Sequence, residues 1–320
     1  KNECAHINPE EKKIQQFQNE IIKQEFEKQK QLLNSQTIAI TKSGKKVEIL
    51  ANVGSLNEAR QALKSGADGI GLLRTELCFL ESQTIPDEKT HLDLYNQILE
   101  QLPKKRYTLR LLDFGSDKKT SYLPITSEEN PAMGHRALRL GFSHYNRLLK
   151  PQIRAFLRLS KKFDIKILCP MIATPEDLIQ ILDAIVKEQE ELNLHGEVIQ
   201  KLPPIGIMVE VPNVALNPKD FISKADFFSF GTNDLAQFLM AADRTNEKVS
   251  HYIEVANQSL FKLIKNFTKE VLPHKKEISI CGELASNSAY LKKFIDLGIT
   301  SLSIPPSLIP KIKTEIKSMD

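Results

Sequence analysis

Short runs of β-branched and aromatic residues alternate with longer amphipathic stretches along most of this chain. Eight runs have strand character, at residues 47–53, 69–74, 107–114, 166–172, 205–211, 227–231, 278–281 and 301–304. Helical patterns follow most of them, for example at residues 175–193 and 287–297. Strands that alternate with helices pair in parallel, and eight of them favour a closed barrel over an open sheet. The sequence therefore predicts an α/β fold, a (β/α)8 TIM barrel at residues 37–320. An open doubly wound sheet is the alternative, but no GxGxxG motif supports it.

A charged, Gln-rich segment precedes the predicted barrel. Within residues 14–33, Ile14, Phe17 and Ile21 recur at helical spacing. This pattern predicts a long amphipathic helix. We interpret residues 1–36 as a helical linker segment that packs on the barrel or leads to another domain, and a binding role is the less favoured reading.

Composition excludes several classes of protein. The chain has 320 residues, of which 41% are apolar, enough for one large core. Its 44 Lys and Arg against 40 Asp and Glu give a net charge of +4 without a basic arm, which disfavours nucleic acid. Neither an apolar run of ~18 residues nor a secretory signal is present, so we expect a cytoplasmic protein with no membrane segment. The four cysteines are widely spaced without a CxxC motif, which indicates free thiols.

The segment FFSFGTNDLAQFLMAADR, residues 227–244, is the most informative for function. A buried strand run ends at Gly231, and Asn233 and Asp234 follow it directly. A barrel forms its active site at the C-terminal ends of its strands. These polar residues are therefore candidates for a site, although Asn-Asp before a helix is also a common N-cap.

Charged and polar residues occur at other predicted strand ends as well. They are Arg74, Thr75, Glu76, Arg110, Asp113, Asp117, Lys118, Glu210, Cys281 and Glu283, with Arg136 and Arg139 in a loop-to-helix region and Arg244 after the sixth strand. A cluster of arginines implies a small ligand with several negative charges, such as a phosphorylated carboxylic acid. Glu210 and Asp234 on neighbouring strands offer oxygen ligands for Mg²⁺. The alternatives are surface salt bridges for the arginines, an ion pair for Glu210 and an inert core position for Cys281.

Six motifs in order resemble one family. They are GADGIGLLRTELCFL, LRLLDFGSDK, ENPAMGHRALRL, PPIGIMVEVPNVA, FFSFGTNDLAQFLMAADRTN and ICGELA. Together they resemble the phosphoenolpyruvate-binding barrel of Enzyme I, the phosphoenolpyruvate-protein phosphotransferase of the bacterial sugar phosphotransferase system. Its nitrogen-related paralogue is equally compatible. Pyruvate phosphate dikinase and phosphoenolpyruvate synthase share most of the motifs, but the DRTN at residues 243–246 and the compact length are closer to Enzyme I.

The resemblance implies a role for each site residue. It assigns Arg74 and Arg110 to the phosphoryl group with Lys118 and Arg136 in support, Asn233, Asp234 and Arg244 to the rest of the substrate, Glu210 and Asp234 to Mg²⁺, and Cys281 to catalysis. The Cys281 thiol would protonate the methylene carbon of enolpyruvate as pyruvate forms. A thiol suits this role because its usual pKa of about 8.5 keeps it protonated near neutrality.

The family also implies partners. It passes the phosphoryl group to a histidine on an N-terminal domain and from there to a phosphocarrier protein, and it forms a homodimer. None of the seven histidines here lies in the TSHxAI-type motif of that domain, so we interpret the chain as the C-terminal part of a longer protein. Ser116, His135 and Val211 depart from the family pattern and bear on affinity more than on activity.

Two other classes of function stay open. A regulatory module would bind phosphoenolpyruvate without transferring its phosphoryl group, but it would not need the thiol of Cys281. A lyase or aldolase barrel would use the same Mg²⁺ ligands, but it would leave the arginine cluster poorly explained.

Overall fold

The computed structural model describes residues 9–103, 105–115, 122, 123 and 128–320. Four residues considered in the sequence analysis lie outside these ranges: Cys4, Ser116, Asp117 and Lys118. The predicted role of Lys118 in binding the phosphoryl group therefore stays a prediction.

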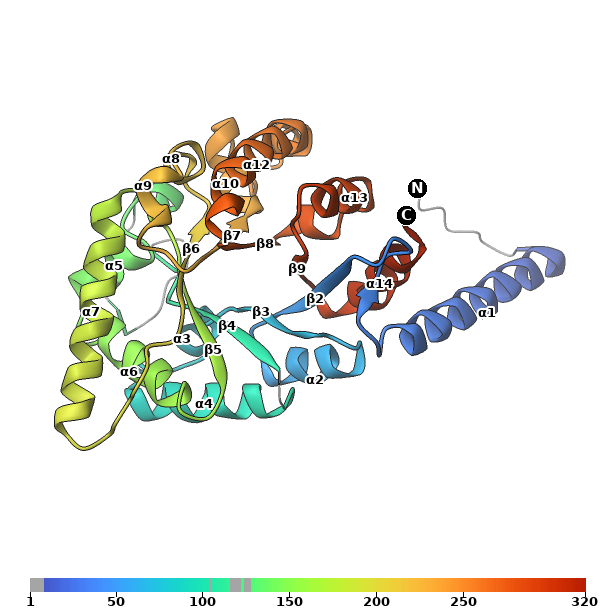
Figure 1. Ribbon diagram of the computed structural model, residues 1–320. Helices are drawn as coiled ribbons and strands as arrows, with labels where there is room; N and C mark the ends of the chain where they lie inside the picture. Colours follow the sequence, from blue (N-terminus) through green and yellow to red (C-terminus); the bar gives the residue numbers. More distant parts are fainter. Residues whose placement is uncertain (1–8, 104, 116–121, 124–127) are drawn as a thin grey trace.

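A closed ring of eight parallel strands forms the centre of the molecule (Figure 1). The strands are β2 (Lys46–Val53), β3 (Gly69–Leu73), β4 (Arg106–Arg110), β5 (Asp164–Cys169), β6 (Ile205–Val209), β7 (Phe227–Gly231), β8 (Glu277–Cys281) and β9 (Ser301–Ile304). Each pairs with the next, and β9 closes the ring on β2 in the register Ile49↔Leu302. The predicted (β/α)8 barrel is confirmed. A two-residue strand that was not predicted, β1 (Ala39–Ile40), pairs antiparallel with β2.

Helices surround the ring of strands (Figure 1). The α-helices after the first are α2 (Leu56–Lys64), α3 (Glu76–Leu80), α4 (Glu88–Glu100), α5 (Leu138–Ser143), α6 (Leu149–Leu159), α7 (Pro175–Leu194), α8 (Pro212–Leu216), α9 (Lys219–Ile222), α10 (Thr232–Met240), α11 (His251–Val255), α12 (Asn257–Val271), α13 (Ser288–Asp296) and α14 (Ile309–Ser318). Short 3-10 segments are η1 (Pro131–Met133), η2 (Leu272–His274), η3 (Glu283–Ser286) and η4 (Pro306–Leu308). Local sequence explains their starts: Thr174 and Asp177 form a capping box before α7, which has Pro175 at its first turn.

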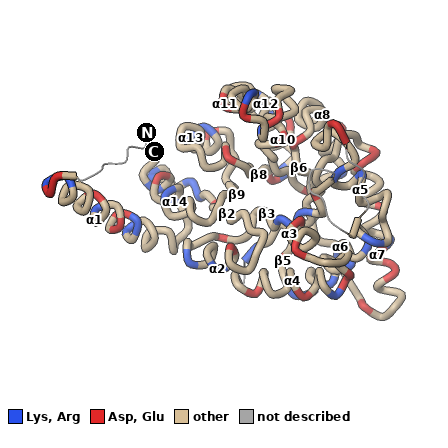
Figure 2. The backbone as a smooth tube through the Cα atoms, turned by 180° about the vertical axis from the view of Figure 1, so that it is seen from behind, with Lys and Arg blue, Asp and Glu red and all other residues tan. Residues whose placement is uncertain are grey.

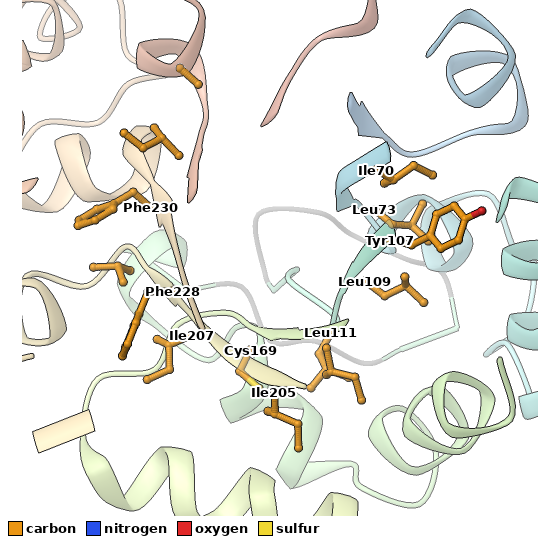
Figure 3. Packing of buried hydrophobic residues seen from close by; sticks show 14 of the residues in the cluster. Ile70, Leu73, Tyr107, Leu109, Leu111, Cys169, Ile205, Ile207, Phe228 and Phe230 are labelled. Carbon is orange, nitrogen blue, oxygen red and sulfur yellow. The ribbon is translucent and has the colours of Figure 1, made fainter. Parts of the chain in front are cut away.

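Alternation along the strands separates an outer core from the barrel interior. Tyr107 and Leu109 of β4 point outward under the helices, as do Phe228 and Phe230 of β7 (Figure 3). The alternate positions face inward and form a smaller cluster of Leu72, Leu168, Met208, Phe227 and Cys281. Because side chains on a strand alternate between its faces, the same strands build the helix-packed core and line the interior. The interior positions nearest the C-terminal strand ends therefore open onto any site formed there.

The predicted N-terminal helix exists as α1 (Glu11–Asn34). It projects from the side of the barrel, beside α14 (Figure 1), and its residues are not buried. The buried Lys313 of α14 fixes the chain that follows α1, because its Nζ donates to the carbonyl of Ser35 at 3.1 Å and to Asp68 at 2.7 Å. The division into a linker at residues 1–36 and a barrel at residues 37–320 stays a prediction.

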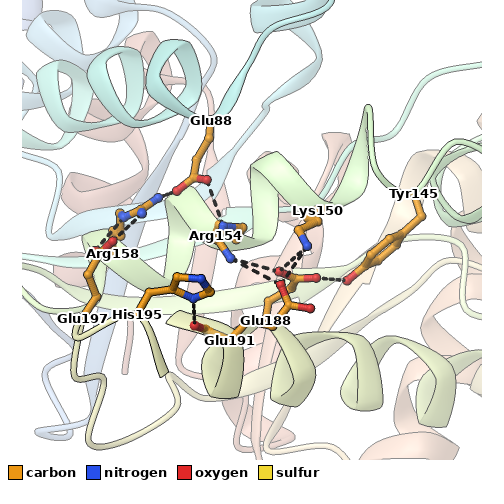
Figure 4. A network of polar contacts seen from close by, with 9 residues as sticks. All are labelled: Glu88, Tyr145, Lys150, Arg154, Arg158, Glu188, Glu191, His195 and Glu197. Carbon is orange, nitrogen blue, oxygen red and sulfur yellow. Dashed lines mark hydrogen bonds and ion pairs between the residues drawn. The ribbon is translucent and has the colours of Figure 1, made fainter. Parts of the chain in front are cut away.

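A network of ion pairs ties α4, α6 and α7 together on the outside of the barrel (Figure 4). Glu188 of α7 is fully buried and accepts from Tyr145 Oη at 2.7 Å and from Arg154 of α6 at 3.4 Å. Arg154 also donates to Glu88 of α4 at 2.9 Å. Basic and acidic residues are interspersed over these helices and α1 (Figure 2). Among the described residues, no helix is both long enough and apolar enough to span a membrane.

Candidate functional site

A cavity of about 840 Å³ opens at the C-terminal ends of the barrel strands. This is the end at which (β/α)8 barrels carry their active sites, and the volume suits a small ligand. Every predicted site residue within the described ranges lines the cavity: Arg74, Arg110, Arg136, Glu210, Asn233, Asp234, Arg244 and Cys281. Segments more than 200 residues apart in sequence are thus brought into one site.

Three buried carboxylates meet in the floor of this cavity. Oxygen atoms of Asp113, Glu210 and Asp234 all lie within 4.8 Å of one another. Glu210 follows β6 and is 1% exposed; its Oε1 accepts from the Met171 amide at 2.7 Å. Its Oε2 is buried and has no hydrogen-bond partner among the described residues. A Cβ at position 231 would lie 2.8 Å from this oxygen, so Gly231 gives the Glu210 carboxylate its space.

The carboxylates fit a hard divalent cation. Burial, reinforced by the charges of Asp113 and Asp234, raises the pKa of the Glu210 carboxyl to about 8. Clustered acidic groups of this kind are stabilised by a cation, and Mg²⁺ prefers carboxylate oxygens supplemented by water and ligand phosphates. The unpartnered Oε2 of Glu210 would supply one oxygen ligand to such a cation, and a carboxylate oxygen of Asp234 nearby would supply another.

Arg110 and Arg136 are buried beside these carboxylates. Arg110 forms an ion pair with Glu76 and another with Asp113 at 2.9 Å. Arg136 pairs with Asp113 at 2.6 Å and with Asp234 at 3.6 Å. Burial alone would lower the pKa of each guanidinium, but the adjacent carboxylates outweigh it and raise both values. Both arginines therefore keep their positive charge in the cavity.

Local backbone geometry brings Arg136 to this position. A Cβ at Gly115 would lie 2.5 Å from the Cβ of Arg136, so only glycine allows the approach. Ala137 has a positive φ of 53° and donates its amide to the Phe114 carbonyl at 2.9 Å. These contacts hold the segment against the end of β4. The nearby Arg139 bonds instead to the carbonyl of Met133, outside the cavity lining.

The arginines retain donors for a ligand. The Nε atoms of Arg74, Arg110 and Arg136 are buried and have no hydrogen-bond partner among the described residues. Buried N–H groups without acceptors are rare and costly in folded proteins. Acceptor oxygens of an anionic ligand would satisfy them.

Asn233 and Asp234 lie in the first turn of α10, whose N-cap position is Gly231, so neither is the N-cap residue. Asn233 Oδ1 accepts the amide of Glu283 at 3.0 Å, which leaves its Nδ2 group as a donor. Gly282 has φ of +89°, and a Cβ there would lie 2.4 Å from the Thr232 hydroxyl. The glycine thus allows α10 and the end of β8 to approach each other. Arg244 follows α10 at 3.7 Å from Asp234.

Cys281 ends β8 in the barrel interior and lines the cavity floor. The side chain is 1% exposed, and its Sγ donates to the Phe230 carbonyl at 3.1 Å. Burial raises the pKa of this thiol to about 12. Cys281 is therefore a protonated thiol at neutral pH, a state suited to donating a proton rather than to nucleophilic attack. Cys78, Cys169 and Cys281 are free thiols, as predicted.

Three acidic residues that contact the arginines of the cavity had no predicted role. Asp113 was noted at a strand end, but β4 ends at Arg110, and Asp113 turns back to pair with both buried arginines. Its spacing from Arg110 is the signal that could have revealed it. Glu76 was noted only as polar, and Glu58 not at all, although both line the cavity.

Comparisons with known proteins agree with this architecture. A family model described as PEP-utilising enzyme, PEP-binding domain matches residues 27–320. The phosphoenolpyruvate-protein phosphotransferase of Listeria monocytogenes is 35% identical over 318 residues, covering 98% of this chain and 55% of that protein. The protein of the same name from Bacillus subtilis is 34% identical over 288 residues, covering 90% and 50%. The chain thus spans about half the length of these curated relatives.

Solved structures share the fold at low identity. A pyruvate kinase from Cryptosporidium parvum aligns with a TM-score of 0.52 and 10% identity, covering 88% of this chain and 70% of that one. A citrate lyase from Burkholderia xenovorans aligns with a TM-score of 0.50 and 14% identity, covering 84% and 76%. At these identities the likeness shows the fold alone.

Proposed function

The chain belongs to the PEP-binding domain family of PEP-utilising enzymes, and from this premise we propose that it binds phosphoenolpyruvate together with Mg²⁺. Within a longer protein, it would transfer the phosphoryl group to a histidine of an N-terminal domain and release pyruvate. One observation carries the proposal. The Nε donors of three arginines that line the cavity have no acceptor, and the buried Oε2 of Glu210 beside them has no donor, among the described residues. A ligand that carries both phosphate and a metal satisfies the two sets at once.

The arginines would bind and stabilise the phosphoryl group. Arg74 and Arg110 present planar sets of donors that match phosphate oxygens, with Arg136 beside them. Phosphoryl transfer needs positioning and charge neutralisation more than covalent chemistry from the protein. Because Arg110 and Arg136 are held by carboxylates before any ligand binds, their reorganisation in the reaction is small.

Glu210 and Asp234 would hold the metal. When bound, Mg²⁺ supplies charge neutralisation between the carboxylates and the substrate oxygens. The Met171 amide anchors Glu210 Oε1, which leaves the unpartnered Oε2 as the atom that would hold the ion. Asp113 completes the acidic group while orienting Arg110 and Arg136.

Asn233 and Arg244 would bind the carboxylate end of the substrate. The contact with the Glu283 amide orients Asn233 so that Nδ2 can donate. Arg244 lies beyond Asp234 and has a side chain that is 41% exposed, so it can close onto a ligand. These two donors would place the methylene carbon near Cys281.

Cys281 would supply the proton that turns the enolate into pyruvate. As the bond between the bridging oxygen and phosphorus breaks, the enolate electron pair returns to the methylene carbon, which takes the proton from Sγ. The resulting thiolate is stabilised by the positive charge of Arg110, which lowers the thiol pKa against the larger effect of burial. A domain that only sensed phosphoenolpyruvate would have no use for this donor.

The names of the relatives support the Enzyme I reading over a pyruvate phosphate dikinase or phosphoenolpyruvate synthase domain. We propose as part of the same function that this reaction is the first step of a phosphotransferase system. The phosphocarrier partner, the homodimer and the cytoplasmic location also stay predictions. Sedimentation across micromolar concentrations checks the homodimer, and a monomer throughout would contradict it.

Calorimetry with phosphoenolpyruvate in Mg²⁺ and in EDTA tests the binding proposal. We expect binding in Mg²⁺ and much weaker binding in EDTA. Arg110→Met should abolish it, whereas Arg106→Met is a matched control, because Arg106 begins the same strand and pairs with Glu48 and Glu277. Equal binding in EDTA and in Mg²⁺, or equal losses in the two variants, would contradict the proposal.

A further inference from the structure

We propose that Glu58 is the positioning residue of Arg74, holding its guanidinium in the orientation that receives the phosphoryl group. This inference rests on the proposed function and deepens it. Glu58 lies on α2 and lines the cavity, and its two carboxylate oxygens accept from Arg74 Nη2 at 2.9 and 3.1 Å. Its position on another element from Arg74, which follows β3, makes it a separate support for the arginine.

The Glu58 side chain is itself fixed by the start of α2. Ser55 is the N-cap, and its side chain accepts the Glu58 amide at 3.2 Å. The Glu58 Oε2 accepts the amide of Gly54 at 2.6 Å. A carboxylate in the first turn of a helix is also stabilised by the helix dipole. Backbone and side chain of Glu58 are therefore both anchored before it contacts Arg74.

Arg74 depends on this contact more than the other arginines do. Arg110 pairs with Glu76 and Asp113, and Arg136 pairs with Asp113 and Asp234. Among the described residues, Glu58 is the only ion-pair partner of Arg74, whose side chain is 43% exposed. A long, half-exposed arginine loses rotamer freedom when a ligand immobilises it, so prior immobilisation strengthens binding.

One donor of Arg74 has no acceptor in this arrangement. Glu58 engages Nη2, while the buried Nε has no hydrogen-bond partner among the described residues. Glu58 also brings a negative charge near the phosphate site, which opposes binding. The two effects predict opposite results for its removal: weaker binding if Glu58 positions Arg74, tighter binding if it only competes for Arg74.

A double-mutant cycle separates these effects. The dissociation constant of phosphoenolpyruvate with Mg²⁺ is measured for wild type, Glu58→Ala, Arg74→Ala and the double variant, with pyruvate as a ligand that lacks the phosphoryl group. Glu48→Ala is the matched control, because Glu48 is about as exposed as Glu58 and pairs with an arginine, Arg106, but lies outside the cavity lining. Thermal unfolding of each variant reports the loss of stability.

We expect Glu58→Ala to weaken phosphoenolpyruvate binding about tenfold and pyruvate binding much less. In the Arg74→Ala background the same substitution should have little further effect, and Glu48→Ala should leave affinity unchanged. Unchanged or tighter binding by Glu58→Ala, or an equal loss with and without Arg74, would overturn the inference. If wild type failed to bind phosphoenolpyruvate with Mg²⁺, the proposed function itself would be wrong.

Discussion

Two clusters of charged side chains in this barrel differ in the hydrogen bonds and ion pairs that their members form. At the strand ends, Glu210, Arg110 and Arg136 are buried, and each has a polar atom with no hydrogen-bond partner among the described residues. On the outer surface, Glu188 is equally buried but receives bonds from Tyr145 and Arg154 and lies 3.5 Å from Lys150 (Figure 4). Each carboxylate of the outer cluster, Glu88 included, forms an ion pair with a basic side chain of that cluster, whereas Glu210 forms no ion pair among the described residues.

Their pKa values differ in the same way. A hydrogen bond from Lys150 lowers the pKa of Glu191, and bonds from Arg158 lower that of Glu197. Burial instead raises the pKa of Glu210 to about 8. Paired carboxylates on a surface stabilise the protein modestly, while clustered carboxylates in a cavity are held at a cost in stability. We infer that the outer cluster serves the fold and the inner one serves a ligand.

The largest expected effect is on Cys281, an uncharged member of the inner site. In the proposed longer protein that carries the histidine domain, Cys281→Ala should slow pyruvate formation by ~10² to 10⁴, or about 3 to 5 kcal/mol, because general acid catalysis is lost. Binding of phosphoenolpyruvate and Mg²⁺ should stay nearly intact. Single-turnover assays of phosphorylation and pyruvate release measure this. Wild-type pyruvate formation with only a lowered melting temperature would remove Cys281 from the mechanism.

The next effect is on Glu210, which separates function from stability. Glu210→Gln should weaken Mg²⁺ binding by about 100-fold or more, since losing even a supporting residue of a metal site costs 10- to 100-fold. Its melting temperature should stay close to that of the wild type at pH 7, because the Glu210 carboxyl is mostly protonated there and the amide that replaces it is also uncharged. Calorimetry and thermal unfolding check the two outcomes. Unaltered Mg²⁺ affinity would contradict the assignment of Glu210 as a ligand.

Glu188→Gln makes the matched change in the outer cluster. The substitution removes the buried one of the two carboxylates that Arg154 and Lys150 share, so we expect a loss of about 1 to 3 kcal/mol in the free energy of unfolding. Affinity for phosphoenolpyruvate and Mg²⁺ should not change. Urea unfolding measures the first effect and calorimetry the second. A loss of affinity similar to that of Glu210→Gln would break the distinction between the two clusters.

Local pattern predicted most of this fold because each strand is short and apolar enough to stand out. Each of the eight predicted runs overlaps an observed strand, while the two-residue β1 was missed because so short a strand shows no alternation. The predicted run at 107–114 extended too far, since β4 ends at Arg110. The apolar residues Leu111, Leu112 and Phe114 that follow are buried in the outer core and mimic a strand.

The barrel topology also explains which site residues were found. Residues at strand ends converge by symmetry, so Arg110, Glu210 and Cys281 could be placed in one cavity from their positions alone. Contacts between a helix and the strand that follows it are not marked by any regular spacing in the sequence. The bond between Glu58 and Arg74 is of this kind, and so is the ion pair of Glu76 with Arg110. Only the folded arrangement reveals them.

The smallest expected effect is a dependence of Mg²⁺ affinity on pH. Because the pKa of Glu210 is raised to about 8, this carboxyl is mostly protonated at pH 7, and Mg²⁺ must displace its proton. Affinity should therefore rise about tenfold per pH unit between roughly pH 6 and 8 and level off above, where the carboxylate is already ionised. The same raised pKa means that the folded state without metal takes up a proton, so this group's contribution to stability falls as pH rises from the usual carboxyl pKa toward 8.

The surface pair of Lys89 and Asp93 offers a control for this pH dependence: Asp93→Asn should leave the profile of Mg²⁺ affinity against pH unchanged. Calorimetry in two buffers of different ionisation enthalpy should show about one proton released per Mg²⁺ at pH 7. An affinity that is constant from pH 6 to 8, with no proton release, would show that Glu210 is already ionised in the empty cavity and that its environment resembles the paired glutamates of the outer cluster.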